Sequence, residues 1–170
     1  MKAIFYLFTV MFVFSCVNKN NEPIDFMNDD SNVVIAPQLP DAPRWVSDTE
    51  EILNTGIDSI QDLCNLIYEE TGHMIMIHTI ESYDPYDNLN DYTSALDLLW
   101  ADDGKKYVIF IISDKLEELR IIHGEATETI LPLDFTEMIM NRDMFPEFRN
   151  GNYSGGVLNA LESYRQILKN

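Results

Sequence analysis

Basic residues are scarce in this sequence. Its 170 residues include 11 Lys and Arg against 29 Asp and Glu, which gives a formal net charge of -18 at pH 7. Nucleic acids and anionic lipid surfaces carry charge of the same sign and would repel so acidic a chain. The composition therefore argues strongly against a nucleic-acid partner, and it permits divalent cations, basic proteins or a plain solvated surface.

The one apolar run long enough to be a targeting segment lies at the N-terminus. Lys2 is followed by eleven mostly apolar residues, 4–14, and a small residue. This pattern is typical of a secretory signal peptide, and the run is too short for a permanent membrane span. The sequence Val-Phe-Ser before Cys16 resembles a bacterial lipobox. We therefore predict a lipoprotein signal peptide over residues 1–15 and lipidation of Cys16; an ordinary signal peptide cleaved elsewhere is the alternative.

Residues 17–44 show little periodic apolar pattern and hold four of the seven prolines. We predict that residues 16–44 form the lipidated cysteine and a flexible tether, with an average reach of roughly 30 Å. The acidic stretch 25–30 is interpreted as solvated linker, with a calcium loop as the alternative. No dense acidic run follows Cys16, which favours a periplasm-facing membrane anchor over the cell surface. A single domain is expected over residues 45–170.

Apolar spacing within this domain predicts alternating helices and strands. Asp48, with Glu51 three residues later, has the form of a capping box at a helix start. Apolar residues at spacings of three and four predict that this helix continues to Gly72. Residues 73–80 are predicted to form a buried strand. An acidic loop and a second helix, ending at Trp100, follow.

The second half of the domain shows the same alternation. Residues 107–112 are almost continuously apolar, as in a strand covered on both faces. A tight turn leads to another strand at 119–124, and helices are predicted around 135–142 and 157–168. Alternation of this kind indicates an α/β layered domain with at least three strands.

Short motifs in this order resemble the TPM domain family, named after a thylakoid-lumen phosphatase, a photosystem-repair protein and a receptor modulator. Each motif is short, but they occur in the family's order with suitable gaps over about residues 45–170. They are Val46 to Asp48, Thr71-Gly72, Trp100, Asp103-Gly104, the turn with Gly124 and Glu128, and the segment Pro146 to Gly156.

The resemblance implies a three-layer α/β/α sandwich around a small mixed sheet. Family members are often extracytoplasmic and anchored to a membrane, which agrees with the independent interpretation of Cys16. Divalent-cation binding, acid phosphatase activity and accessory roles in the assembly or repair of membrane complexes have each been attached to one member or another.

A divalent-cation site is one candidate function. Calcium and magnesium need several carboxylate oxygens converging from loops, and ligands in layered α/β domains gather near strand ends. The candidate metal ligands are Asp48, Asp103, Asp114 and Glu128, of which the first, second and fourth match the family pattern. Alternatively, Asp48 is a helix cap and Glu128 a cap or the partner of an arginine.

Side chains for covalent catalysis are few. Of the three histidines, His73 and His78 lie five residues apart in a predicted strand and so point to opposite faces. We interpret them and His123 as structural, and Cys64 as a small buried hydrophobe within a helix. No nucleophile–base arrangement is found, and no catalytic residue is assigned.

Phosphatase chemistry would have to depend on a metal. Basic groups that could hold phosphate are scattered along the chain, and no glycine-rich turn with a lysine precedes a helix. We therefore predict a membrane-anchored extracytoplasmic lipoprotein with a TPM-like domain that acts as a binding or accessory module for an unidentified protein. A metal-dependent phosphatase is the alternative.

The segment Pro146 to Gly156, PEFRNGNYSGG, carries three glycines, a proline and two aromatic residues. It contains no acid–base pair and no phosphate cradle of its own. We interpret it as a structural turn in which Phe148 and Tyr153 fix the loop to the core and direct the last helix.

Overall fold

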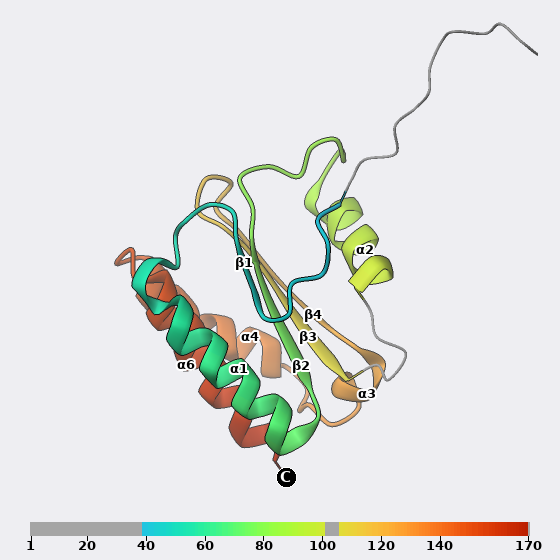
Figure 1. Cartoon of the computed structure of the whole chain (residues 1–170), viewed down its shortest axis with the longest axis vertical. Helices are drawn as coiled ribbons and strands as arrows, with labels where there is room; N and C mark the ends of the chain where they lie inside the picture. The colour runs from blue at the N-terminus through green and yellow to red at the C-terminus, as the bar shows by residue number, and fades with distance from the viewer. Residues whose placement is uncertain (1–38, 101–105, 170) are drawn as a thin grey trace, which may run out of the picture. The chain divides into compact units, whose positions relative to one another are not determined.

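Four strands form one mixed sheet in the computed structural model of this chain (Figure 1). Their order follows the sequence: β1 (Val46–Asp48), β2 (Met74–Thr79), β3 (Tyr107–Ser113) and β4 (Glu118–His123). The first three strands run parallel, and β4 runs antiparallel to β3. The sheet confirms the predicted α/β fold class.

The structure describes residues 39–100 and 106–169, which belong to one compact unit. The predicted signal peptide, Cys16 and most of the predicted tether lie outside the described residues. The last residues of that tether contact the domain, because the Pro40 carbonyl accepts a hydrogen bond from Trp100 Nε1 at 2.9 Å. No helix within the described ranges is long and apolar enough to cross a membrane.

Helices α1 (Ile57–Thr71) and α6 (Tyr153–Leu168) lie side by side on one face of the sheet (Figure 1). Ile60 and Ile67 of α1 and Tyr164 of α6 share one buried cluster with Ile77 and Phe110 of the strands. These residues recur at helical spacing in the helices and at every second position in the strands, so each element presents one apolar face.

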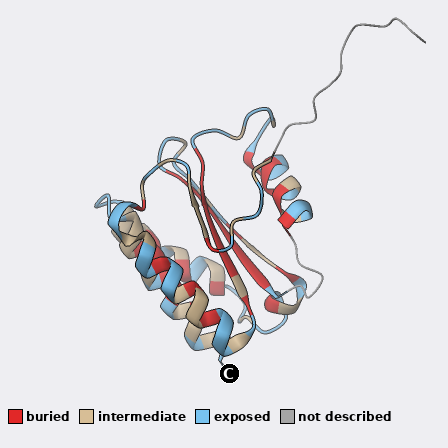
Figure 2. Cartoon of the chain, viewed as in Figure 1, coloured by how far each residue is buried: buried red, intermediate tan, exposed pale blue. Residues whose placement is uncertain are grey.

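Helix α2 (Leu89–Trp100) covers the opposite face of the sheet. Leu96 and Trp100 pack there against Met76, Ile109 and Ile111, which alternate with the strand residues of the other cluster. Strand β3 is consequently buried along its whole length (Figure 2), as expected for a strand covered on both sides. The result is the three-layer arrangement predicted from the sequence.

The predicted end of the first helix is confirmed. Gly72 follows α1 with a φ of 74°, a left-handed conformation that favours glycine, and its N–H donates to the Tyr68 carbonyl at 2.8 Å.

The predicted start of that helix is wrong. Residues Val46 to Asp48 form β1, and a 3-10 turn, η1 (Asn54–Gly56), precedes the helix proper. Pairing with β2 competes with helix formation here, and Glu51, which would be the third residue of the predicted helix, has a φ of 56°, outside the right-handed helical region. Asp48 caps the loop between strand and helix instead.

The segment between β4 and α6 is a series of short helices. It comprises α3 (Glu125–Glu128), α4 (Phe135–Ile139), a π-helical turn η2 (Met140–Met144) and α5 (Phe145–Phe148). The helix predicted around 135–142 is therefore α4 with its π-helical continuation. Asp143 of that turn is buried and accepts hydrogen bonds from the side chains of Arg142 and Ser163, which ties the turn to α6.

Candidate functional site

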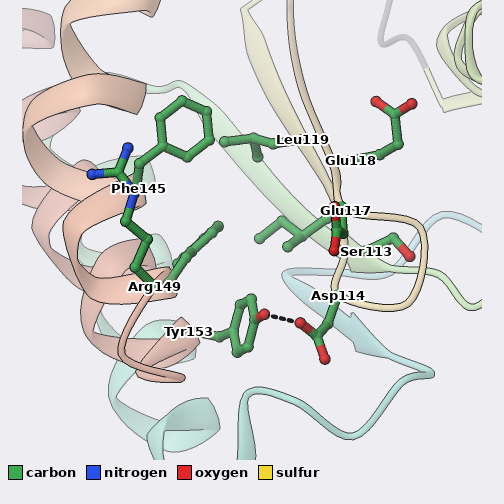
Figure 3. Close-up of a pocket in the computed structure, with 10 residues that line it drawn as sticks. Ser113, Asp114, Glu117, Glu118, Leu119, Phe145, Arg149 and Tyr153 are labelled. Carbon is green, nitrogen blue, oxygen red and sulfur yellow. Dashed lines mark hydrogen bonds between the residues drawn. The ribbon is translucent and has the colours of Figure 1, made fainter.

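A pocket of about 480 Å³ lies between the turn that follows β3 and the start of α6 (Figure 3). We call it the Tyr153 pocket. It is lined by Ile112, Ser113, Asp114, Glu117, Glu118, Leu119, Phe145, Phe148, Arg149 and Tyr153. It lies at the carboxyl end of a central strand, where ligands bind in open α/β sheets.

One wall of the pocket is the tight turn from β3 to β4. Glu50 fixes this turn from a distant part of the chain: its carboxylate accepts hydrogen bonds from the backbone N–H of Asp114 at 3.0 Å and of Lys115 at 2.9 Å. The Ser113 hydroxyl accepts the Leu116 N–H at 3.1 Å and so closes the turn from within. These contacts hold the acidic wall in place.

The other wall comes from the segment Pro146 to Gly156. The rings of Phe148 and Tyr153 are 4.8 Å apart between centroids, with an interplanar angle of 42°. Asn152 caps α6, since its side chain accepts the Gly155 N–H at 3.1 Å. The structural role predicted for this segment is confirmed, but its part in lining a pocket was not predicted.

Tyr153 joins the two walls. Its phenolic O–H donates a hydrogen bond to the carboxylate of Asp114 (Figure 3). Burial, this hydrogen bond, and the nearby carboxylates of Glu50 and Glu117 raise the pKa of Tyr153 to about 12. The phenol therefore stays neutral at physiological pH and keeps its hydrogen directed at Asp114.

The pocket is acidic overall. Three acidic residues, Asp114, Glu117 and Glu118, line it together with one base, Arg149, and the Glu118 carboxylate points away from Phe145 and Tyr153 (Figure 3). The Arg149 side chain extends toward Phe145 and away from Asp114 (Figure 3). Within residues 39–100 and 106–169, no ion pair neutralises Glu117 or Glu118.

Two of the predicted metal ligands lie at the same end of the sheet. Asp48 is the last residue of β1 and Asp114 directly follows β3. Because these strands run parallel, their carboxyl ends lie at the same end of the sheet. The Asp48 carboxylate accepts three hydrogen bonds, from Ile52 N–H at 3.2 Å, Leu53 N–H at 3.0 Å and the Thr79 hydroxyl at 2.7 Å. A capping role is thus fully accounted for by these contacts.

A third predicted ligand, Glu128, is not brought to that end of the sheet. Glu128 lies in α3, directly after β4. Because β4 runs antiparallel to β3, Glu128 lies at the opposite end of the strands. Asp103 lies outside the described residues. In the described part of the chain, no three His, Cys, Asp or Glu side chains are grouped so that they could hold a metal ion. The four-residue cation site stays a prediction.

Two of the three histidines, His78 and His123, make contacts typical of structural residues, whereas the buried Nε2 of His73 has no hydrogen-bond partner among the described residues. His78 is buried, with Nδ1 3.3 Å from the Ser47 carbonyl and Nε2 2.9 Å from the Tyr92 hydroxyl. Because a carbonyl only accepts, Nδ1 carries the hydrogen and Nε2 accepts from the tyrosine. His123 Nε2 lies 2.6 Å from the Tyr164 hydroxyl. Burial lowers the pKa of both histidines to about 4, and neither lines the Tyr153 pocket.

Cys64 is fully buried in α1, as predicted. Burial raises the pKa of its thiol to about 12, so the reactive thiolate is absent at neutral pH.

The family model described as the TPM domain matches residues 46–167. The chain belongs to the TPM domain family. The match spans every strand and almost all of α6, so the TPM domain includes both walls of the Tyr153 pocket. No match to the chain was found among curated proteins.

Solved structures resemble this TPM domain in fold. The N-terminal domain of a protein from P. gingivalis is 22% identical, with a TM-score of 0.65 over 75% of this chain and 83% of that one. The BA42 protein of Bizionia argentinensis is 15% identical, with a TM-score of 0.55 over 66% of this chain and 78% of that one. The N-terminal domain of the cg2496 protein of Corynebacterium glutamicum is 19% identical, with a TM-score of 0.54 over 75% and 84%.

Proposed function

We propose that this chain is a lipid-anchored, extracytoplasmic protein whose TPM domain binds a protein partner through the Tyr153 pocket. The observation that carries the proposal is a pocket whose two walls are each held rigid by other parts of the domain. Glu50, in the loop after β1, holds the acidic wall, and the Leu53 carbonyl of the same loop accepts a hydrogen bond from the Ser154 hydroxyl of the aromatic wall. A preformed site loses little conformational entropy when it binds, which favours recognition.

The groups in the pocket suit binding better than catalysis. Ser113 is the one hydroxyl there beside Tyr153, and it bonds to the Leu116 N–H and to the Glu50 carboxylate at 3.3 Å. The Glu50 carboxylate also accepts two backbone N–H groups. The Ser113 hydroxyl and the Glu50 carboxylate are therefore both engaged in holding the turn. A nucleophile needs a base that is free to take its proton.

Photo-crosslinking in cells tests the binding role. The full chain carries a benzoylphenylalanine in place of Leu119, which lines the pocket, or of Asp62, an exposed α1 residue outside it. We expect a discrete crosslinked protein with the pocket probe and none with the α1 probe. Equal products from both probes, or none from either, would overturn the proposal.

The membrane anchor is supported by the lipobox-like sequence that ends at Cys16. Cells expressing the chain are grown with an alkyne-bearing fatty acid, and the chain is then isolated and coupled to a dye. We expect the natural chain to be labelled and to sediment with membranes, and Cys16→Ser to lose both properties. Labelling that survives the substitution would contradict lipidation at this residue.

A divalent cation is a separate part of the proposal, with calcium or magnesium as the candidate ion. It is supported by the position of Asp48 and Asp114 at the carboxyl ends of the parallel strands β1 and β3. An ion that binds the native state raises the melting temperature. We expect calcium to raise it, a chelator to reverse the rise, and Asp114→Asn to abolish it. An unchanged melting temperature would remove the cation from the proposal.

Metal-dependent phosphatase activity is the alternative function. The observation in its favour is that the carboxylates of Asp114 and Glu117 border the pocket, where they could share a cation with a phosphate group. The full chain is assayed with a generic phosphate ester, with and without calcium, magnesium or manganese. We expect no turnover. Metal-dependent turnover that Asp114→Asn abolishes would replace the binding proposal with the enzymatic one.

A further inference from the structure

The Tyr153 pocket combines two kinds of surface that rarely face each other. Aromatic rings of Phe145, Phe148 and Tyr153 form one side, and the carboxylates lie on the turn opposite (Figure 3). An aromatic face attracts a cation through its quadrupole, and a carboxylate attracts the same cation by charge. Both surfaces therefore favour a positively charged group.

The dimensions of the pocket suit a side chain. Its volume of about 480 Å³ lies toward the lower end of the range for small-molecule sites. Leu119 adds apolar surface, which matches the aliphatic part of a long basic residue.

We infer that the Tyr153 pocket binds an arginine or lysine side chain of the partner protein. The inference rests on the proposed binding function and names the chemistry of the partner. Arginine fits better, because its planar guanidinium stacks on an aromatic ring and donates hydrogen bonds to carboxylates at the same time. A partner with exposed basic residues is also attracted by the whole chain, whose net charge is -18.

An anionic ligand is disfavoured by the same groups. The Tyr153 hydrogen is already donated to Asp114, so it is not available to an anion. Arg149 is the one base that lines the pocket, and its side chain is directed away from Asp114 (Figure 3). Arg149 is exposed at the rim, where solvent and salt screen its repulsion of an incoming cation.

Peptide titration followed by NMR tests the inference. The isotope-labelled full chain, held in a neutral detergent, is titrated with acetyl-Gly-Arg-Gly-amide or with the uncharged acetyl-Gly-Gln-Gly-amide. We expect the arginine peptide alone to shift the amide resonances of Leu119, Phe148 and Tyr153, and its affinity to fall as salt is raised. Equal binding of the glutamine peptide would overturn the inference.

A pair of double variants separates the pocket from the general acidity of the chain. Asp114→Asn with Glu117→Gln removes two charges from the pocket. Asp62→Asn with Glu137→Gln removes two exposed charges outside the pocket. We expect the first pair to weaken arginine-peptide binding roughly fivefold and the second to leave it unchanged. Equal effects of the two pairs would overturn the inference.

Three further outcomes separate this inference from its alternatives. A partner crosslinked through position 119 in cells, without any binding of the arginine peptide, overturns the inference and leaves the binding function standing. Absence of both the crosslinked partner and the peptide binding overturns the inference and the proposed function together. Calcium that shifts the same resonances and displaces the peptide overturns the inference in favour of a metal ion.

Discussion

Asp48 accepts the hydroxyl hydrogen of Thr79 at 2.7 Å and thereby joins the ends of the neighbouring strands β1 and β2. The two residues are also register partners in the parallel ladder. The same carboxylate caps the loop before α1 through two backbone N–H groups. Asp48 is therefore part of the framework at the carboxyl ends of the parallel strands, where the Tyr153 pocket lies.

Replacement of Asp48 by alanine should destabilise the domain. The change leaves the N–H groups of Ile52 and Leu53 and the Thr79 hydroxyl without their acceptor, at a cost of about 1–3 kcal/mol in the free energy of unfolding. Urea unfolding measures it, with Asp62→Ala on exposed α1 surface as the control. Equal midpoints for the two variants would contradict a framework role.

Replacement of Gly156 by alanine should disturb the aromatic wall. An added Cβ would lie 2.6 Å from Phe148 Cε1 and 3.1 Å from the Met144 carbonyl oxygen, so the Phe148 ring must move. We expect a loss of about 1–3 kcal/mol in unfolding free energy and weaker arginine-peptide binding. Asn159→Ala, at an exposed position of the same helix, is the control and should leave both unchanged. Unchanged stability and unchanged peptide binding in Gly156→Ala would show that the Phe148 ring moves aside at little cost in free energy.

Acidification should destabilise the domain through its buried histidines. In the folded chain the pKa of His78 and of His123 is about 4, whereas an unfolded histidine titrates near 6.5. Between these values the unfolded chain binds more protons, so the unfolding free energy falls as the pH is lowered from about 6.5 toward 4. His78 alone contributes up to roughly 3 kcal/mol of this loss.

Unfolding in urea at several pH values measures this dependence. The variant His78→Gln cannot titrate, so its stability should fall less steeply over the same interval, although it is less stable at pH 7. An identical slope for the variant and the natural chain would show that His78 is not held neutral by burial.

Thiol counting should report on both cysteines at once. Cys64 is buried with a raised pKa, so it should react with Ellman's reagent only after unfolding. A lipid on Cys16 blocks the other thiol. We therefore expect no reactive thiol in the native, membrane-extracted chain and one in denaturant. Two thiols in denaturant would contradict lipidation, and one in the native state would show either that Cys16 is free or that Cys64 is accessible.

Local patterns in the sequence were sufficient for much of the fold. The apolar run at 107–112 predicted β3 to within one residue, because a strand buried on both faces has no polar positions to obscure it. Gly72 marked the end of α1, since its left-handed conformation is a property of the residue itself.

The rest depends on contacts between distant residues. Strand β1 has three residues and exists through its pairing with β2, so no periodicity could show it, and the local capping-box pattern at Asp48 predicts a helix start instead. The pocket joins Asp114 to Tyr153, 39 positions later. Each half was visible in the sequence as a turn, but their proximity is a consequence of how α6 packs on the sheet.

The outer edge of β4 has a consequence for chains crowded together. Glu118 and Arg120 are exposed on this edge strand, and charged side chains at such positions discourage another strand from adding to the sheet. At the opposite edge, β1 offers only three residues for pairing. Copies crowded together would therefore resist polymerising into continuous β-structure, and each would keep its pocket open.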